Sequence, residues 1–133
     1  MGQQQLLLIV LGVIIVGVAV VVGIQMFGTG AAQANFDAVM ADLNKIGSDA
    51  QGWYRKPASL GGGNRDFTTL TTLAQIGARD TTENGTYTLA GVDATTIDVT
   101  GVGNEDGDGD GTNVTITLRI TPGALSIQGA PNR

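Results

Sequence analysis

The chain has 133 residues, a length typical of one domain. Only 14% of its residues are charged, against about a quarter in average soluble domains, and 42% are hydrophobic. Histidine and cysteine are absent, which excludes disulfides, thiol nucleophiles, Ser-His-Asp catalysis and zinc fingers. The net charge of −5 argues against nucleic acid as a partner. The sequence offers no set of residues that could act as a nucleophile with its base, so we do not expect an enzyme.

The N-terminal segment is apolar and carries no charge as far as Phe36. Residues 6–24 read LLLIVLGVIIVGVAVVVGI. As a helix rising ~1.5 Å per residue, this run is about 29 Å long, which matches the hydrocarbon core of a bilayer. The residues that we expect to form the anchoring and assembly surface are Gln5, Leu6, Leu7, Leu8, Ile9, Leu11, Ile14, Ile15, Val18, Val21, Ile24 and Phe27.

Three interpretations of this segment compete. A cleaved secretory signal would place its cleavage site near Ala32-Gln33-Ala34, but a basic start is missing and the run exceeds the usual ~7–15 apolar residues. A permanent single-pass anchor would gain no orientation from the positive-inside rule, because no Lys or Arg precedes the run. The third interpretation is an anchor that later packs against copies of itself.

The next segment has the pattern of an amphipathic helix, with apolar residues at spacings of three and four. Asn35 can cap its start if the chain breaks at 28–30; otherwise one helix runs from about Gln3 to about Trp53, roughly 75 Å. Pro57 ends the helical region. The residues expected to pack on the C-terminal part are Phe36, Val39, Met40, Leu43, Ile46 and Trp53.

From Thr81 onward the apolar residues alternate with polar ones, as in half-buried strands. The alternation covers 86–90, 96–100, 114–121 and 124–128. We therefore expect an α+β fold in which the long N-terminal helix packs on a small antiparallel sheet of four strands. Thr121-Pro122-Gly123-Ala124 predicts a type II turn. Residues 67–76 predict a short helical or irregular packing segment, because their apolar residues are three apart.

The stretch 104–113, NEDGDGDGTN, is the most chemically specific in the chain. Alternating carboxylates and glycines let several oxygens converge on a hard cation, as in the opening of a calcium loop. Position twelve of an EF-hand counted from Asp106 is Thr117 rather than Glu, which excludes an EF-hand. The alternatives are another kind of Ca²⁺ loop and a solvated acidic hairpin loop. The candidate ligands are Asp106, Asp108, Asp110, Glu105 and Asn104, with Asn113 as a further donor.

Asn84 and Asn113 each begin an N-x-[ST] sequon and are candidate glycosylation sites. Such triplets also arise by chance, and Asn-Gly at 84–85 is equally a turn signal.

The apolar start MGQQQLLLIVLGVIIVGVAVVVGI, its amphipathic continuation and the C-terminal strands resemble a type IV pilin-like filament subunit. The resemblance implies an inner-membrane pool held by the helix, export by a secretion and assembly machinery, and helical polymerisation with identical subunits outside the cell. Such subunits normally carry Glu at the fifth position, where this chain has Gln5. A Ca²⁺ loop would resemble that of the major pseudopilins.

These observations predict two parts. Residues 1–34 would form the apolar helix for membrane anchoring and the filament core, and 35–133 the amphipathic helix with its sheet. The predicted function is that of a structural subunit of an extracellular filament. The alternative is a membrane-anchored protein with an extracytoplasmic β-rich binding domain.

Overall fold

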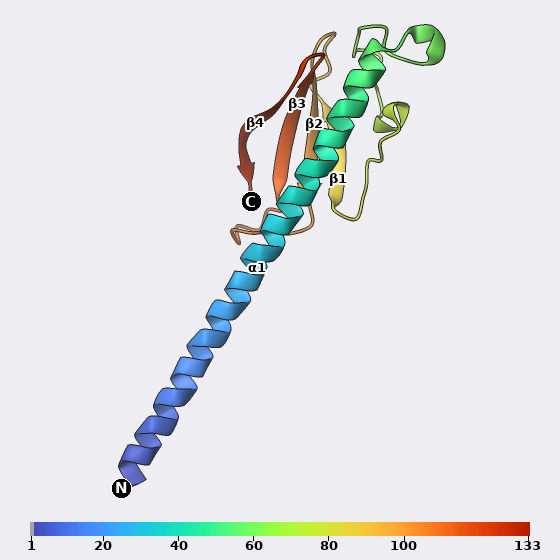
Figure 1. Ribbon diagram of the computed structural model, residues 1–133. Coiled ribbons are helices and arrows are strands. Elements are labelled where there is room, and N and C mark those ends of the chain that lie inside the picture. Colours follow the sequence, from blue (N-terminus) through green and yellow to red (C-terminus); the bar gives the residue numbers. More distant parts are fainter. Residues whose placement is uncertain (1) are drawn as a thin grey trace.

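The computed structural model describes residues 2–133 and contains one long helix packed at its C-terminal half on a four-stranded sheet (Figure 1). This arrangement confirms the predicted α+β fold. In chain order the elements are α1 (Gly2–Arg55), the short 3₁₀ helices η1 (Ala58–Leu60) and η2 (Leu73–Ile76), and the strands β1 (Gly85–Ala90), β2 (Ile97–Gly103), β3 (Thr115–Thr121) and β4 (Ala124–Asn132).

The helix α1 is continuous over 54 residues. Residues 28–30 stay helical, and the Thr29 hydroxyl donates a hydrogen bond to the Gln25 carbonyl at 3.0 Å, within the same helix. The alternative with a chain break and an Asn35 cap is therefore wrong. Asn35 lies inside the helix, where its backbone is already paired and its side chain is free to bind other segments.

The sheet has the order β1-β2-β3-β4, and all neighbouring strands are antiparallel. One face packs on α1 through apolar side chains at alternate positions, as the period-two pattern predicted. Residues 67–76 pack beside this core, irregular over 67–72 and helical over 73–76, which confirms the predicted short helical or irregular packing segment. The core residues on the strands are Tyr87, Ile97, Val99, Ile116, Leu118 and Ile120.

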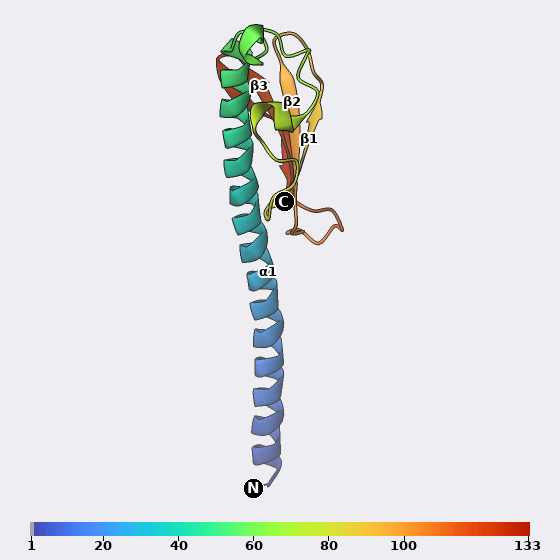
Figure 2. The same ribbon diagram turned by 90° about the vertical axis from the view of Figure 1, so that its right-hand side faces the viewer.

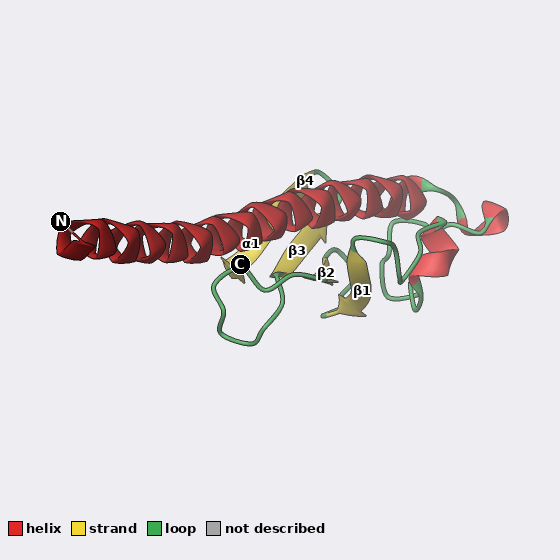
Figure 3. Cartoon of the chain, turned by 90° about the horizontal axis from the view of Figure 1, so that it is seen from below, coloured by secondary structure: helices red, strands yellow, loops and turns green. Residues whose placement is uncertain are grey.

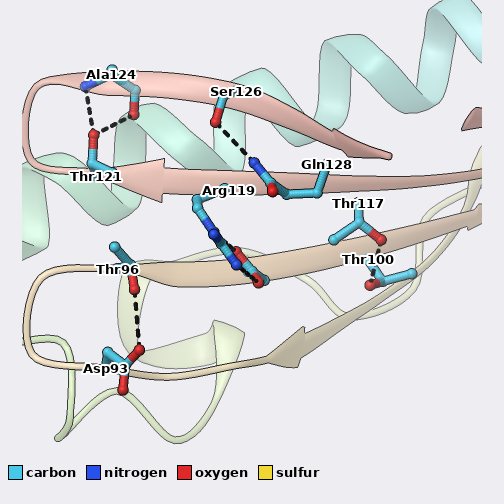
Figure 4. Close-up of polar contacts among 10 residues, drawn as sticks. Asp93, Thr96, Thr100, Thr117, Arg119, Thr121, Ala124, Ser126 and Gln128 are labelled. Carbon is cyan, nitrogen blue, oxygen red and sulfur yellow. Dashed lines mark hydrogen bonds and ion pairs between the residues drawn. The ribbon is translucent and has the colours of Figure 1, made fainter. Parts of the chain in front are cut away.

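The outer face of the sheet is polar (Figure 4). The hydroxyls of Thr100 and Thr117 lie 3.1 Å apart on neighbouring strands, and the Arg119 guanidinium donates two hydrogen bonds of 2.8 Å to the Asp98 carboxylate. These pairs satisfy polar groups on a face that no helix covers, so this face stays hydrated.

Two expectations for the last hairpin are wrong. Gly123 does not have the positive φ that the third position of a type II turn requires, so the turn between β3 and β4 is of another type. The Thr121 hydroxyl closes it, accepting from the Ala124 N–H at 3.0 Å and donating to the Ala124 carbonyl at 3.1 Å. Residues 124–128 were expected to alternate between a buried and a wet face, but their burial does not alternate. Ile127 pairs with the buried Leu118 of β3, yet it is 42% exposed because β4 is an edge strand.

Candidate assembly helix and acidic loop

The first half of α1 extends away from the rest of the molecule (Figures 2 and 3). We call residues 2–31 the free half of α1, because Ala32 is the first buried residue of the helix. Every Leu, Ile, Val, Met and Phe side chain between Leu6 and Phe27 is between 48% and 81% exposed. All the residues predicted for the assembly surface, with Gln5, lie on this free half and are exposed.

The free half also meets the length and composition criteria of a membrane span. Its most apolar window of 18 residues has a mean hydropathy of 3.3, and none of that window is buried within the chain. A long apolar N-terminal helix of this kind indicates membrane association or secretion.

The second half of α1 supplies one side of the hydrophobic core. Of the residues predicted to pack on the sheet, Val39, Leu43, Ile46 and Trp53 are buried. The remaining two, Phe36 and Met40, are partly buried against the same core.

Asn35 connects α1 to the segment that follows β2. Its side-chain oxygen accepts the backbone N–H groups of Asn104 at 2.9 Å and Glu105 at 3.3 Å, and its amide nitrogen donates to the Asn84 carbonyl at 2.8 Å. One amide group of the helix therefore holds both the start of β1 and the start of residues 104–113, which we call the acidic loop. Asn35 was considered in the sequence only as a helix cap, because its partners are distant along the chain.

The acidic loop brings Asp106, Asp108 and Asp110 together, with one carboxylate oxygen of each within 4.8 Å of the others. The backbone N–H groups of Gly111 and Gly109 donate to the two Asp106 oxygens, both at 2.8 Å, and hold the pKa of that carboxyl below its ordinary value. These bonds keep Asp106 ionised and leave lone pairs on all three carboxylates. The donor set fits a hard cation such as Ca²⁺.

The other three candidate ligands lie outside this carboxylate group. Asn104 donates its side-chain amide to the Glu83 carbonyl at 2.8 Å, and Asn113 donates to the Gly103 carbonyl at 3.0 Å. Glu105 makes its hydrogen bonds through the backbone, accepting from Val114 and donating to Asn35. The three aspartates thus converge on one point, whereas Asn104, Glu105 and Asn113 form hydrogen bonds that hold the ends of the loop.

A second polar cluster was not anticipated from the sequence. One oxygen of Asp42, on α1, accepts hydrogen bonds from the Tyr87 hydroxyl at 2.6 Å, the Asn84 amide at 2.9 Å and the Thr82 hydroxyl at 3.0 Å. Partial burial raises the pKa of the Asp42 carboxyl, but these bonds and nearby Lys45 outweigh it, so the pKa lies below its ordinary value. Burial and the bond to Asp42 raise the pKa of Tyr87.

Both sequon asparagines use the side-chain nitrogen to which a glycan would be attached. In Asn84 that nitrogen donates to Asp42, and in Asn113 it donates to the Gly103 carbonyl. Glycosylation at either position would leave that nitrogen a single N–H and place a sugar beside a hydrogen bond that holds two segments together.

Comparisons with known proteins find no match: no protein-family model, no curated protein and no solved structure matches this chain.

Proposed function

We propose that the protein is a structural subunit of an extracellular, type IV pilus-like helical filament that assembles through the free half of α1. The observation that carries this proposal is the continuity of α1. An exposed apolar rod extends, without a break, from the helical segment that forms one side of the domain's core.

Burial of the free half supplies the free energy of assembly. Each large apolar side chain contributes ~1.5–3 kcal/mol when it is fully removed from water. The apolar side chains from Leu6 to Phe27 together amount to tens of kcal/mol by this measure, which no monomer in water can leave exposed. Lipid would cover this surface before assembly, and identical helices would cover it in the filament.

A permanent single-pass anchor is the second candidate, and the mean hydropathy of the free half favours it equally. The flanking residues favour the filament. Permanent anchors are held by Lys and Arg near the ends of the span, whereas on the C-terminal side of this span the first basic residue is Lys45, well inside the folded domain. A C-terminal flank without basic residues suits a helix that must leave the bilayer.

We further propose that the acidic loop binds Ca²⁺ through Asp106, Asp108 and Asp110. Its support is the convergence of three carboxylates in a loop whose glycines Gly109 and Gly111 adopt positive φ and let the chain wrap tightly. A bound ion would reduce the repulsion among these aspartates and rigidify the end of the domain from which the free half of α1 extends.

Deletion of residues 1–27 tests the filament proposal directly. None of residues 2–27 is buried, so the domain is expected to fold as a soluble monomer after the deletion. Full-length protein should form filaments in negative-stain micrographs after detergent removal, and the deleted protein should form none. Filaments that persist after the deletion would refute assembly through this helix, and bilayer-bound full-length protein without filaments would favour the permanent anchor.

A further inference from the structure

The two ends of the folded domain differ in the charged side chains that they carry. The acidic loop lies where the free half of α1 leaves the domain, since Asn35 binds its first two backbone N–H groups. Figure 2 shows this loop, in orange, projecting from the base of the domain. Four acidic residues lie in it: Glu105, Asp106, Asp108 and Asp110.

The opposite end, which we call the tip, carries three basic residues. Arg55 and Lys56 lie where α1 ends, and Arg65 lies in the loop that folds back onto it (Figure 1, green). Asn35 and Arg55 are 20 residues apart on one straight helix, so base and tip are separated by about 30 Å along its axis.

Within residues 2–133, the charges of the acidic loop and of the three basic residues at the tip have no ionic partner. Among residues 2–133 the ion pairs are Lys45–Asp49 and Arg119–Asp98, neither of which lies in the acidic loop or among the three basic residues of the tip. One basic residue, Arg133, is at the base, where it stacks over the Phe36 ring at 4.9 Å. Two acidic residues also lie at the tip, and both accept hydrogen bonds from nearby threonines. The Asp66 carboxylate accepts the Thr68 N–H and hydroxyl, and the Asp93 carboxylate, in the loop between β1 and β2, accepts the Thr96 hydroxyl at 3.4 Å.

Two of the basic residues of the tip line a single surface cavity, which we call the hollow. Its volume is about 410 Å³, and it is lined by Tyr54, Arg55, Arg65, Pro122 and Gly123. The Arg55 guanidinium is positioned by a 3.0 Å hydrogen bond to the Pro122 carbonyl. Arg65 has a left-handed φ of 65° and donates its N–H to the Tyr54 carbonyl at 2.7 Å, which keeps it beside Arg55.

We propose that the hollow at the tip receives the acidic loop of a second copy of this chain, stacked along the axis of α1. This inference rests on the proposed filament and identifies one of its contacts. Arginine is suited to bind carboxylates, and the loop of a copy displaced along the axis presents four of them, which carry a charge of −4 without a bound ion and of −2 with Ca²⁺. The contact joins two different surfaces, so it is heterologous and propagates into an open helical array.

The contact supplies something that the free half cannot. Apolar burial is proportional to area and has little direction, so packed helices can slide along one another at small cost. Opposite charges that meet only at one axial offset fix the register, since a shifted subunit places charges without partners. The charged ends therefore set the axial spacing of subunits that the apolar helices hold together.

Charge reversal on the full-length chain tests this contact. The tip variant is Arg55→Glu/Arg65→Glu, and the base variant is Glu105→Lys/Asp108→Lys, which leaves the Asp106 hydrogen bonds of the loop in place. The measurement is the critical concentration for filament formation after detergent removal, in buffer with a calcium chelator. Each variant should raise it by about tenfold or more, because like charges face each other. The combined variant should restore assembly.

A pair of single substitutions provides the matched control: the critical concentration of Arg79→Glu, outside the hollow, is compared with that of Arg65→Glu, inside it. Both arginines are exposed and outside the ion pairs of residues 2–133, and both substitutions change the charge equally. Arg79→Glu should leave the critical concentration unchanged. Circular dichroism checks that every variant folds.

The outcomes separate this contact from the proposed function. Loss in both variants with recovery in the combined one supports the contact. Normal assembly of the tip variant, or failure of the combined variant to recover while folded, overturns it and leaves the filament standing. Absence of filaments from the unmodified protein overturns the proposed function itself.

Discussion

Asp42 is the residue whose contacts join the helix to the first strand. Three hydrogen-bond donors from residues 82–87 meet one of its carboxylate oxygens. The Tyr87 side chain is only 1% exposed, so loss of the acceptor would leave a buried hydroxyl without its partner.

We expect Asp42→Ala to lower the free energy of unfolding by roughly 1.5–3 kcal/mol, the range for hydrogen bonds to charged groups. The measurement is urea unfolding of the detergent-solubilised protein followed by circular dichroism. Asp49→Ala is the matched control on the same helix. It removes only an exposed ion pair with Lys45 and should cost at most about 0.5 kcal/mol. Equal effects of both substitutions would contradict the role of Asp42.

The lowered pKa of Asp42 also predicts a pH dependence. A carboxyl with a lower pKa in the folded state stabilises the fold above its unfolded pKa, and this contribution is lost as the pH falls through the folded value. The melting temperature should therefore fall as the pH drops below about 4, the ordinary pKa of an aspartate. In Asp42→Asn the melting temperature should fall less over the same pH range. An equal fall in both proteins would show that other carboxylates cause the pH dependence.

Calcium is expected to bind at the three aspartates of the acidic loop. At about a hundred times the dissociation constant, the free energy of unfolding should rise by about 2.7 kcal/mol. Titration calorimetry of the detergent-solubilised chain measures binding, and Asp108→Asn/Asp110→Asn should abolish it because two of the three carboxylates are removed. Absence of binding heat at millimolar calcium would refute a Ca²⁺ site in the acidic loop.

At the scale of elements, α1 meets the sheet at two close approaches. A Cβ on Gly47 would lie 2.7 Å from the Leu125 Cδ2 atom, and a Cβ on Gly101 would lie 2.9 Å from the Val39 Cγ1 atom. Glycine at these positions lets the helix and the strands β2 and β4 come close enough to bury the core between them.

Two glycines of the same helix give a matched test of this packing. Gly52 has open space around it, so Gly52→Ala should raise the free energy of unfolding by about 0.5–1 kcal/mol through helix propensity alone. Gly47→Val should instead lower it by about 1–3 kcal/mol, because the larger side chain collides with Leu125. Chemical unfolding of both variants checks the prediction, and stabilisation by Gly47→Val would show that Leu125 moves aside freely.

For the whole molecule, the division of α1 into a free and a packed half determines behaviour in water. A charge on the free half would be buried among apolar helices in a filament. We expect Ile14→Asp, at a side chain that is 57% exposed in the single chain, to raise the critical concentration at least about a hundredfold. Ile14→Val keeps the apolar surface and is the control. Filaments formed normally by Ile14→Asp, seen by electron microscopy, would place this face outside the filament core.

The elements of this protein were predictable from the sequence because their signals are local. An uncharged apolar run, an apolar stripe with a spacing of three and four, and four alternating segments each depend on neighbouring residues. The same holds for the three aspartates of the acidic loop, which lie within five residues of one another and converge by local turns.

Only the tertiary structure decided which distant residues meet. The bonds from Asn35 to Asn104 and from Asp42 to Tyr87 join residues 69 and 45 positions apart, and no periodicity predicts such pairs. The exposure of Ile127 follows from the place of β4 at the sheet edge. The tertiary structure also decided that the acidic loop lies at one end of the domain and the three basic residues of the tip at the other. Each strand and the helix run from one end of the domain to the other, so every connecting loop lies at one of these two ends. Periodicity reports which face of an element is buried, whereas packing determines what lies against it.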